Sequence, residues 1–343
     1  FQTMSYSLDI YHGKLKPTKD FISFASFVSF FPQLVAGPIE RASNLLPQIL
    51  SYRVFKYEQG VQGLRLILYG MFKKVVIADS LSIQVDTIFQ NYSNLNGGIL
   101  LLGLLYFSFQ IYCDFSGYSD IAIGTSKLFG FELMSNFKFP YFSRDIGEFW
   151  RRWHISLSTW FRDYLYIPLG GSKGGKWLSI RNIFIIFIVS GFWHGPNWAF
   201  IAWGLIHALF YIPIFLIGKN RRYITTIVAG DRWFPSLKEF FQMGVTFFLT
   251  MIAWVFFRSE NISSAFTYLF KMINEIELPS DNRGGIIFVV LLVVLEWFIR
   301  RDERNPINIK NKYTRWLIYA FLNYLVFAYL EIIDLSQFIY FQF

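Results

Sequence analysis

Long runs of apolar residues, rather than alternating apolar and polar positions, dominate this chain. Two of these runs, residues 21–36 and 61–78, are predicted to be re-entrant or interfacial, because Pro32 interrupts the first and charged residues interrupt the second. The other runs approach or reach transmembrane length and predict about six full or partial membrane passes, at residues 98–113, 183–193, 198–217, 240–257, 285–299 and 316–333. The pattern therefore predicts an all-α polytopic membrane protein.

Composition supports a membrane protein and narrows the chemistry. Of the 343 residues, 54% are hydrophobic and only 16% are charged, against about 25% charged in an average globular domain. This excludes a disordered chain, and aromatic residues at 21% are typical of lipid-facing and interfacial belts. The single Cys113 excludes an intrachain disulfide, a Cys-rich zinc site and an iron–sulfur cluster, and no metal site is expected. Without repeats or a soluble linker, residues 1–343 are interpreted as one membrane-embedded domain.

The net charge of +9 arises mainly from Lys and Arg in the segments between the apolar runs. Lys and Arg concentrate in residues 144–181, 219–232 and 300–315, which are predicted to be cytoplasmic, whereas the more acidic stretch 258–283 is predicted to be external. Cytoplasmic basic loops explain the charge, so no nucleic-acid partner is expected. The chain opens on polar residues without a leader and on Phe1 rather than Met. We therefore expect an N-terminal part to be missing from this sequence.

A histidine follows the shortest of the apolar runs. Residues 183–193 would rise only about 16 Å as a helix, roughly half of the hydrocarbon core, before the break at Gly195 and Pro196. His194 is therefore predicted at the tip of a half-pass inside the membrane. An ionisable residue at that depth is a functional candidate. The alternative is a neutral histidine that bridges two helices by hydrogen bonds.

Two other segments combine polar and apolar residues in unusual ways. In residues 149–166 aromatic rings alternate with arginines, as in an interfacial anchor, but His154 adds polarity that anchoring does not need. In residues 112–124, Asp114 and Asp120 lie among small residues. Close helix packing through Gly117 and Gly124 and buried polar anchoring are both possible there. His12 and His207 are interpreted as structural.

Four sequence motifs resemble the membrane-bound O-acyltransferase family, and its bacterial alginate O-acetyltransferase-like branch most of all. They are FVSFFPQLVAGPIERASNLLPQ at 27–48, YCDFSGYSDIAIG at 112–124, FWRRWHISLSTWFRDYLYIPLGG at 149–171 and GFWHG at 191–195. The resemblance covers nearly the whole chain, and because members of the family usually begin with several more transmembrane helices, it implies that the missing N-terminal part carries such helices. It implies a helical body with a transmembrane tunnel that admits an acyl thioester from the cytoplasm and a hydroxyl acceptor from the other face.

The resemblance also implies roles for individual residues. His194 matches the invariant histidine of the family, and His154 matches its second polar position. A histidine suits a base that removes the hydroxyl proton, because its unperturbed pKa is about 6.5. Candidate donors to the oxyanion are His154, Trp193 and Asn197. Candidate contacts to the phosphates of coenzyme A, or to an acidic carrier protein, are Arg151, Arg152 and Lys173, although these residues could equally serve as orientation charges.

The resulting expectation is an O-acyltransferase of the bacterial cytoplasmic membrane. It would move acetyl from acetyl-coenzyme A, or another acyl thioester, toward an extracytoplasmic polysaccharide, without a tightly bound cofactor. The alginate-like branch implies a periplasmic esterase-fold partner, besides the membrane lipids. One alternative is transfer of D-alanine from a carrier protein to a cell-envelope polymer. A transporter is the alternative outside enzymes, but the paired broken helices that it needs are not visible.

Overall fold

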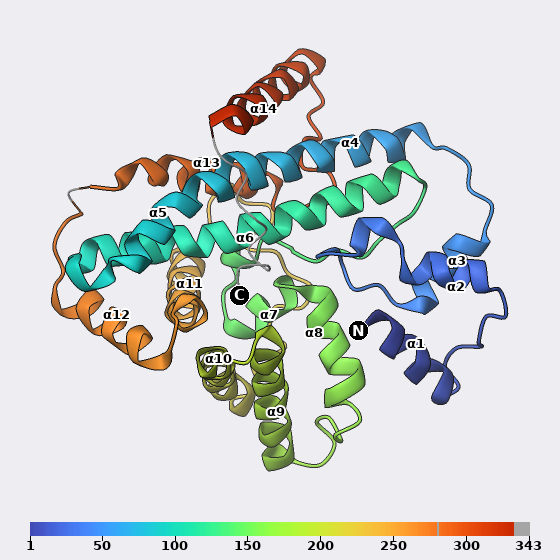
Figure 1. Cartoon of the computed structure of the whole chain (residues 1–343), viewed down its shortest axis with the longest axis horizontal. Coiled ribbons are helices and arrows are strands. Elements are labelled where there is room, and N and C mark those ends of the chain that lie inside the picture. Colours follow the sequence, from blue (N-terminus) through green and yellow to red (C-terminus); the bar gives the residue numbers. More distant parts are fainter. Residues whose placement is uncertain (280, 333–343) are drawn as a thin grey trace.

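The computed structural model describes residues 1–279 and 281–332, and every regular element in this part of the chain is helical (Figure 1). Two π-helical segments, η2 (Phe72–Ala78) and η5 (Arg162–Tyr166), continue α4 and α8. The helices are α1 (Gln2–Tyr11), α2 (Phe21–Val28), α3 (Ala42–Leu50), α4 (Tyr57–Met71), α5 (Asp79–Gln90), α6 (Gly97–Leu128), α7 (Ile146–Arg152), α8 (Ile155–Phe161), α9 (Lys176–His194), α10 (Trp198–Leu216), α11 (Leu237–Arg258), α12 (Ile262–Asn274), α13 (Ile286–Ile299) and α14 (Lys312–Ile332).

Four of these helices, α6, α9, α10 and α11, are long and apolar enough to cross a membrane. The prediction of about six full or partial passes is thus reduced to four full-length candidates among the described residues. The run 285–299 forms α13, whose 14 residues are short for a bilayer. The run 316–333 corresponds to α14, except that residue 333 lies outside the described residues. The run 21–36 is broken as predicted, since α2 ends at Val28 and Pro32 lies in a separate short turn.

Helix α6 forms the centre of the molecule, and α4, η2 and α5 run antiparallel along it (Figure 1). Glycines permit this close contact: a Cβ added to Gly117 would lie 2.8 Å from the carbonyl oxygen of Gly70, and one added to Gly70 would lie 2.6 Å from that of Gly117. The run 61–78, predicted to be re-entrant or interfacial, is therefore part of a long helical stretch packed on α6. Its lysines, Lys73 and Lys74, pair inside the protein with Asp120 and Asp114 of α6. The re-entrant or interfacial placement of this run stays a prediction.

Helices α9 and α10 form an antiparallel hairpin, in which Gly191 lies against the backbone of Phe200. The predicted half-pass is wrong in length, because α9 begins at Lys176 and has 19 residues, a rise of about 28 Å. Polar residues near its start do not interrupt the helix. Asn182 is buried and donates from Nδ2 to the carbonyl oxygens of Leu169 and Gly171. His194 is therefore the last residue of a full-length helix.

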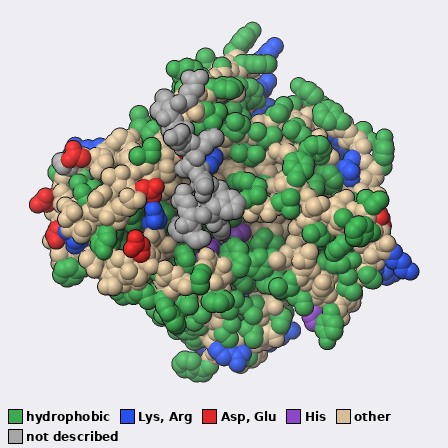
Figure 2. Space-filling view, in the orientation of Figure 1, with side chains coloured by type: hydrophobic (Ala, Val, Ile, Leu, Met, Phe, Trp, Pro, Cys, Tyr) green, Lys and Arg blue, Asp and Glu red, His purple; other side chains and the backbone are tan. Residues whose placement is uncertain are grey.

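The basic loops and the acidic loop lie at opposite ends of the bundle. The basic loop after α10 contacts the basic segment after α13, because Arg300 donates to the carbonyl oxygens of Val228 and Arg232. At the other end of α11, the turn between α9 and α10 contacts the acidic stretch, since Asn197 donates to the carbonyl oxygen of Glu260 at 2.7 Å. Figure 2 shows acidic side chains gathered over the end of the molecule that carries α12. The charge separation read from the sequence thus corresponds to two ends in space.

Candidate active site

One cavity of about 1070 Å³ reaches both predicted histidines. His154 comes from the junction of α7 and α8, and His194 comes from the end of α9, so the fold brings together two residues that are 40 positions apart. Trp150 and Trp203 line the same cavity. Toward the basic end of the bundle its lining includes Lys138, Arg151, Arg152, Arg162, Arg221, Arg300 and Arg301. The cavity therefore joins a pair of histidines to a strongly basic opening.

His154 is held in an unusual backbone conformation between two short helices. Its φ of 42° is left-handed, which is uncommon for a residue other than glycine, and its side chain is only 5% exposed. Its Nδ1 lies 3.0 Å from Oδ1 of Asn136, and its ring packs edge-on against Phe115 at 4.6 Å between centroids. Burial lowers the pKa of His154, and the neighbouring His194 lowers it further. His154 is therefore held as a neutral imidazole at pH 7.

His194 lies where α9 ends and the chain turns at Gly195. It is partly buried, and its ring packs edge-on against Trp203 and Phe257, with centroids 5.1 and 5.0 Å away. Aromatic side chains from α10 and α11 thus fix the position of this imidazole beside the cavity. A neutral imidazole in such a setting can accept a proton from a hydroxyl group.

The two predicted arginines lie on α7 and line the cavity, but they already have protein partners. Arg152 pairs with Glu148 at 2.7 Å, and Arg151 donates to the carbonyl oxygen of Asn220 at 2.7 Å. Two further nitrogens of Arg151, Nε and Nη2, are buried and have no hydrogen-bond partner among the described residues. Lys173 is exposed in the turn before α9 and lies outside the cavity lining. Three residues are predicted to contact the acyl donor. Of these, Arg151 and Arg152 line the cavity together with the histidines, and Lys173 does not.

The other two predicted oxyanion donors lie outside the lining of this cavity. Trp193 is 39% exposed, and its ring packs between Phe1 and His194, at 5.3 and 4.8 Å between centroids. Asn197 caps α10, because its Oδ1 accepts from the amide of Ala199 while its Nδ2 donates to Glu260. Both polar atoms of Asn197 are thus used to hold the turn between α9 and α10.

The motif at 112–124 joins α6 to its neighbours through buried polar pairs. Asp120 accepts a 2.6 Å ion pair from Lys73, and Asp114 accepts one of 2.7 Å from Lys74; both lysines belong to η2. Tyr112 donates to Glu296 of α13 at 2.6 Å. With the glycine contacts described above, the structure confirms both alternatives for this motif: close helix packing and buried polar anchoring occur together.

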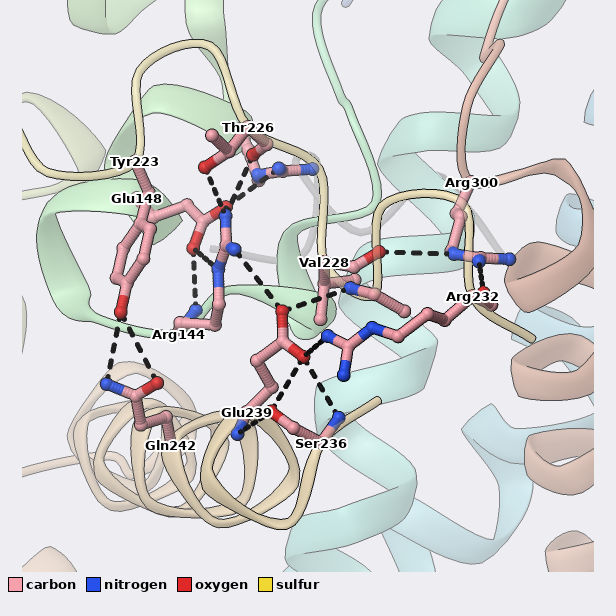
Figure 3. A network of polar contacts seen from close by, with 12 residues as sticks. Arg144, Glu148, Tyr223, Thr226, Val228, Arg232, Ser236, Glu239, Gln242 and Arg300 are labelled. Atoms are coloured by element: carbon pink, nitrogen blue, oxygen red, sulfur yellow. Dashed lines mark hydrogen bonds and ion pairs between the residues drawn. The ribbon is translucent and has the colours of Figure 1, made fainter. Parts of the chain in front are cut away.

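A second polar network joins α7, the loop after α10 and the start of α11 (Figure 3), and several of its residues line the basic end of the cavity. The buried Arg144 makes a two-pronged ion pair with Glu148 at 2.9 to 3.0 Å and donates to the carbonyl oxygen of Thr226 at 2.8 Å. It also lies 3.6 Å from Glu239 at the start of α11. This network holds the loop after α10 against α7, where that loop contributes to the cavity lining.

Several residues at the site could not be identified from the sequence alone. Asn136 lies in the segment between α6 and α7 with no local pattern that marks it, yet it contacts His154 directly. Trp203 resembles the other apolar residues of α10, although it lines the cavity. The sequence shows only basic residues in loops at three further positions of the lining, Arg221, Arg300 and Arg301.

Among the residues that the structure describes, no three His, Cys, Asp or Glu side chains form a group that could hold a metal ion.

Comparison with known proteins gives a consistent set of relatives. Residues 14–227 match the membrane-bound O-acyltransferase family. The chain is 43% identical to "Probable alginate O-acetylase AlgI" of Pseudomonas syringae pv. tomato, over 88% of this chain and 57% of that protein. It is 40% identical to the peptidoglycan O-acetyltransferase of Helicobacter pylori, over 74% and 47%. It is also 33% identical to the teichoic acid D-alanyltransferase of Streptococcus thermophilus, over 54% and 48%. The chain thus spans about half to three fifths of the length of these relatives.

Proposed function

Because this chain belongs to the membrane-bound O-acyltransferase family, we propose that it transfers an acyl group, namely acetyl, from a cytoplasmic thioester to a hydroxyl group on the other side of the bacterial cytoplasmic membrane. The observation that carries the proposal is the single cavity that both His154 and His194 line and that opens among basic side chains. Such a cavity suits a reaction between an anionic donor and an uncharged hydroxyl group.

In the proposed reaction the hydroxyl oxygen of the acceptor attacks the thioester carbonyl carbon. His194 takes the hydroxyl proton as the new C–O bond forms, and the C–S bond then breaks to release the thiolate, which takes up the proton. The products are the ester and the free thiol, so atoms and charge balance. The aromatic rings of Trp203 and Phe257, which pack against His194, hold the base in place.

The basic end of the cavity supports a donor that carries phosphate groups. Arg151 and Arg221 line it from α7 and from the loop after α10, and guanidinium groups suit phosphate oxygens. Because basic loops remain in the cytoplasm, this end faces the cytoplasm, where acetyl-coenzyme A is available. Lys173 is exposed outside this lining and would meet the donor only at the surface.

The acceptor is proposed to be an extracytoplasmic polysaccharide, reached directly or through a periplasmic esterase-fold partner that takes the acetyl group first. The support is that relatives at about 40% identity are named for O-acetylation of alginate and of peptidoglycan. The relative named for D-alanyl transfer matches a smaller share of this chain, 54%. Transfer of D-alanine therefore stays the second candidate.

The donor can be tested in sealed proteoliposomes with the basic loops facing inward. Acetyl-coenzyme A enclosed in the vesicles should be consumed, with acetyl appearing on an external hydroxyl acceptor or on the partner. Acetyl-coenzyme A added only outside should be inactive. Activity that requires an aminoacylated carrier protein would contradict acetyl transfer and support D-alanyl transfer. A protein that transfers no acyl group from either donor would contradict both functions.

A further inference from the structure

Asn136 connects the motif on α6 to the histidine between α7 and α8. Its side chain is buried and makes hydrogen bonds in two directions. The amide nitrogen Nδ2 donates to Oγ of Ser119 on α6 at 3.1 Å. The amide oxygen Oδ1 lies 3.0 Å from Nδ1 of His154 and 2.9 Å from Oγ of Ser156. Asn136 thus lies between a membrane-spanning helix and a residue that lines the cavity.

The backbone of Ser156 determines which of the two side-chain amide atoms of Asn136, Oδ1 or Nδ2, faces His154. The backbone N–H of Ser156 is directed at the same atom of Asn136, at 3.4 Å, and a backbone N–H can only donate. The atom that receives it must be the oxygen, because two N–H groups facing each other would repel. The Ser119 hydroxyl on the other side can accept from Nδ2 in this orientation. All four polar contacts of the amide therefore agree with one orientation.

The orientation of the amide then determines the tautomer of His154. Since Oδ1 of Asn136 is an acceptor, Nδ1 of His154 must carry the hydrogen in the 3.0 Å contact. In a neutral imidazole the other nitrogen, Nε2, then has a free lone pair. The backbone supports the same arrangement, because the amide of Ile155 donates to the carbonyl oxygen of Asn136 at 2.9 Å. This second bond holds His154 in its left-handed conformation next to Asn136.

We infer that Asn136 is a positioning residue that holds His154 with its hydrogen on Nδ1, so that Nε2 accepts a hydrogen bond from the acceptor hydroxyl in the cavity. The inference rests on the proposed function and refines one part of it. A neutral His154 with this tautomer is an acceptor at Nε2 and not a donor to the oxyanion. Its place in the reaction is then to orient the hydroxyl group whose proton His194 takes.

The groups around His154 determine what its titration reports. His194 on α9 is the titratable group that acts on its charge. The charged groups on the other neighbouring elements are paired within the protein: Asp114 with Lys74, Asp120 with Lys73, and Glu148 with Arg152. Asn136, Ser119 and Ser156 are neutral. A carboxylate placed at position 136 would therefore be a new charge directly on the Nδ1 side of the imidazole.

The tautomer can be read directly by ¹⁵N NMR of protein with labelled histidines. The chain has four histidines, and the signals of His154 are assigned by their loss in His154→Gln. We expect hydrogen on Nδ1 and none on Nε2 at neutral pH in the wild-type protein. In Asn136→Leu, which keeps a side chain of similar size but removes the acceptor, this preference should disappear. Hydrogen on Nε2 of His154 in the wild-type protein would overturn the inference whatever the enzymatic activity is.

The pH profile of acetyl transfer separates positioning from structural support. Asn136→Leu should lose activity on the order of tenfold to hundredfold, the range expected when one buried hydrogen-bond partner is removed. Asn136→Asp can still accept from Nδ1, and its charge should move the acid limb of the profile to higher pH by about one unit or more. Asn274→Asp, on the exposed end of α12, adds the same charge far from the cavity and should leave the profile in place.

Two outcomes of the activity assay would overturn the inference. One is an Asn136→Asp profile that is lowered equally at every pH, since a merely structural role predicts that result. The other is wild-type activity in Asn136→Leu. If the wild-type protein transfers no acyl group from any donor, the proposed function fails, whereas the NMR result still decides the role of Asn136.

Discussion

The ammonium nitrogen of Lys73 lies 2.6 Å from a carboxylate oxygen of Asp120, inside the bundle where η2 packs along α6. Lys73 is 3% exposed and also donates to Oγ of Ser116 at 2.9 Å. An ion pair at this depth must have its polar atoms satisfied, because each unpaired charge in a region of low polarity is costly. The pair explains why the α4–η2–α5 stretch can carry lysines and still pack on an apolar helix.

Lys73→Met should therefore destabilise the protein strongly. Removing one partner of a buried ion pair costs about 3–5 kcal/mol, because the other charge stays buried alone. The melting temperature in detergent should fall clearly, and it should recover in part in the double variant Lys73→Met with Asp120→Leu. Lys271→Met, in the half-exposed pair with Glu275, is the control and should cost less than about 1 kcal/mol. Equal melting temperatures for the two single variants would contradict this account.

The contact between α4 and α6 depends on glycine. A methyl group on Gly117 would lie 2.8 Å from the carbonyl oxygen of Gly70, closer than atoms can approach without a shift of the helices. Gly117→Ala should therefore destabilise the protein by about 1–3 kcal/mol in thermal unfolding. Gly244→Ala on α11 is the matched control, since a methyl group there meets nothing within 4 Å. If both variants unfold at the same temperature, the helices are not in close contact.

Arg144 holds the loop after α10 in place over the cavity. Arg144→Gln removes its ion pair with Glu148 and weakens its bond to Thr226, so the loop should open more often. Limited trypsin digestion should then cut after Arg221 and Arg222 several times faster than in the wild-type protein. The control is Arg283→Gln, at an exposed residue near the start of α13 that donates to the carbonyl oxygen of Pro279 and lies outside this loop. Unchanged cleavage in Arg144→Gln would show that the loop is held by other contacts.

The stability of the protein should depend on pH through His154. Burial lowers the pKa of His154 below the value near 6.5 that it has in the unfolded chain. As the pH falls through about 6.5, the unfolded state binds a proton that the folded state does not, so stability is lost toward acid pH. His154→Gln should reduce the loss of melting temperature between about pH 7.5 and pH 5.5. An unchanged loss in that variant would mean that His154 is accessible to protons in the folded state.

The sequence predicted the helical class, because apolar runs are visible locally, and the two histidines that its motifs single out line one cavity, while their catalytic roles stay predictions. The length of α9 was not visible, since Arg181 and Asn182 read as the end of an apolar run. In the structure Arg181 donates to the side chain of Asn182, and Asn182 donates to the preceding turn, so both fit inside the helix. Partners of this kind are formed by tertiary contacts, which a hydropathy pattern does not contain.

The polar residues around the site illustrate the same limit. Asn136 makes its hydrogen bonds with Ser119, Ser156 and His154, which lie 17, 20 and 18 positions away in the chain. No periodic pattern connects such positions. His207, which the sequence predicts to be structural, is fully buried against Trp150 and Trp203 and lies outside the lining of the cavity. Replacing His207 would therefore disturb the wall behind the site, so the exposed His12 is the better control.

The central claim is that His194 is the base of an acyl transfer in the shared cavity. The most direct measurement is the rate of acetyl transfer by His194→Ala in proteoliposomes, with His12→Ala as the control and with insertion verified for each protein. The account predicts a loss of more than about 10²-fold in His194→Ala, because the base and the alignment of thioester and hydroxyl are lost together. His12→Ala should transfer at the wild-type rate. A correctly inserted His194→Ala protein that transfers acetyl at the wild-type rate would contradict the account.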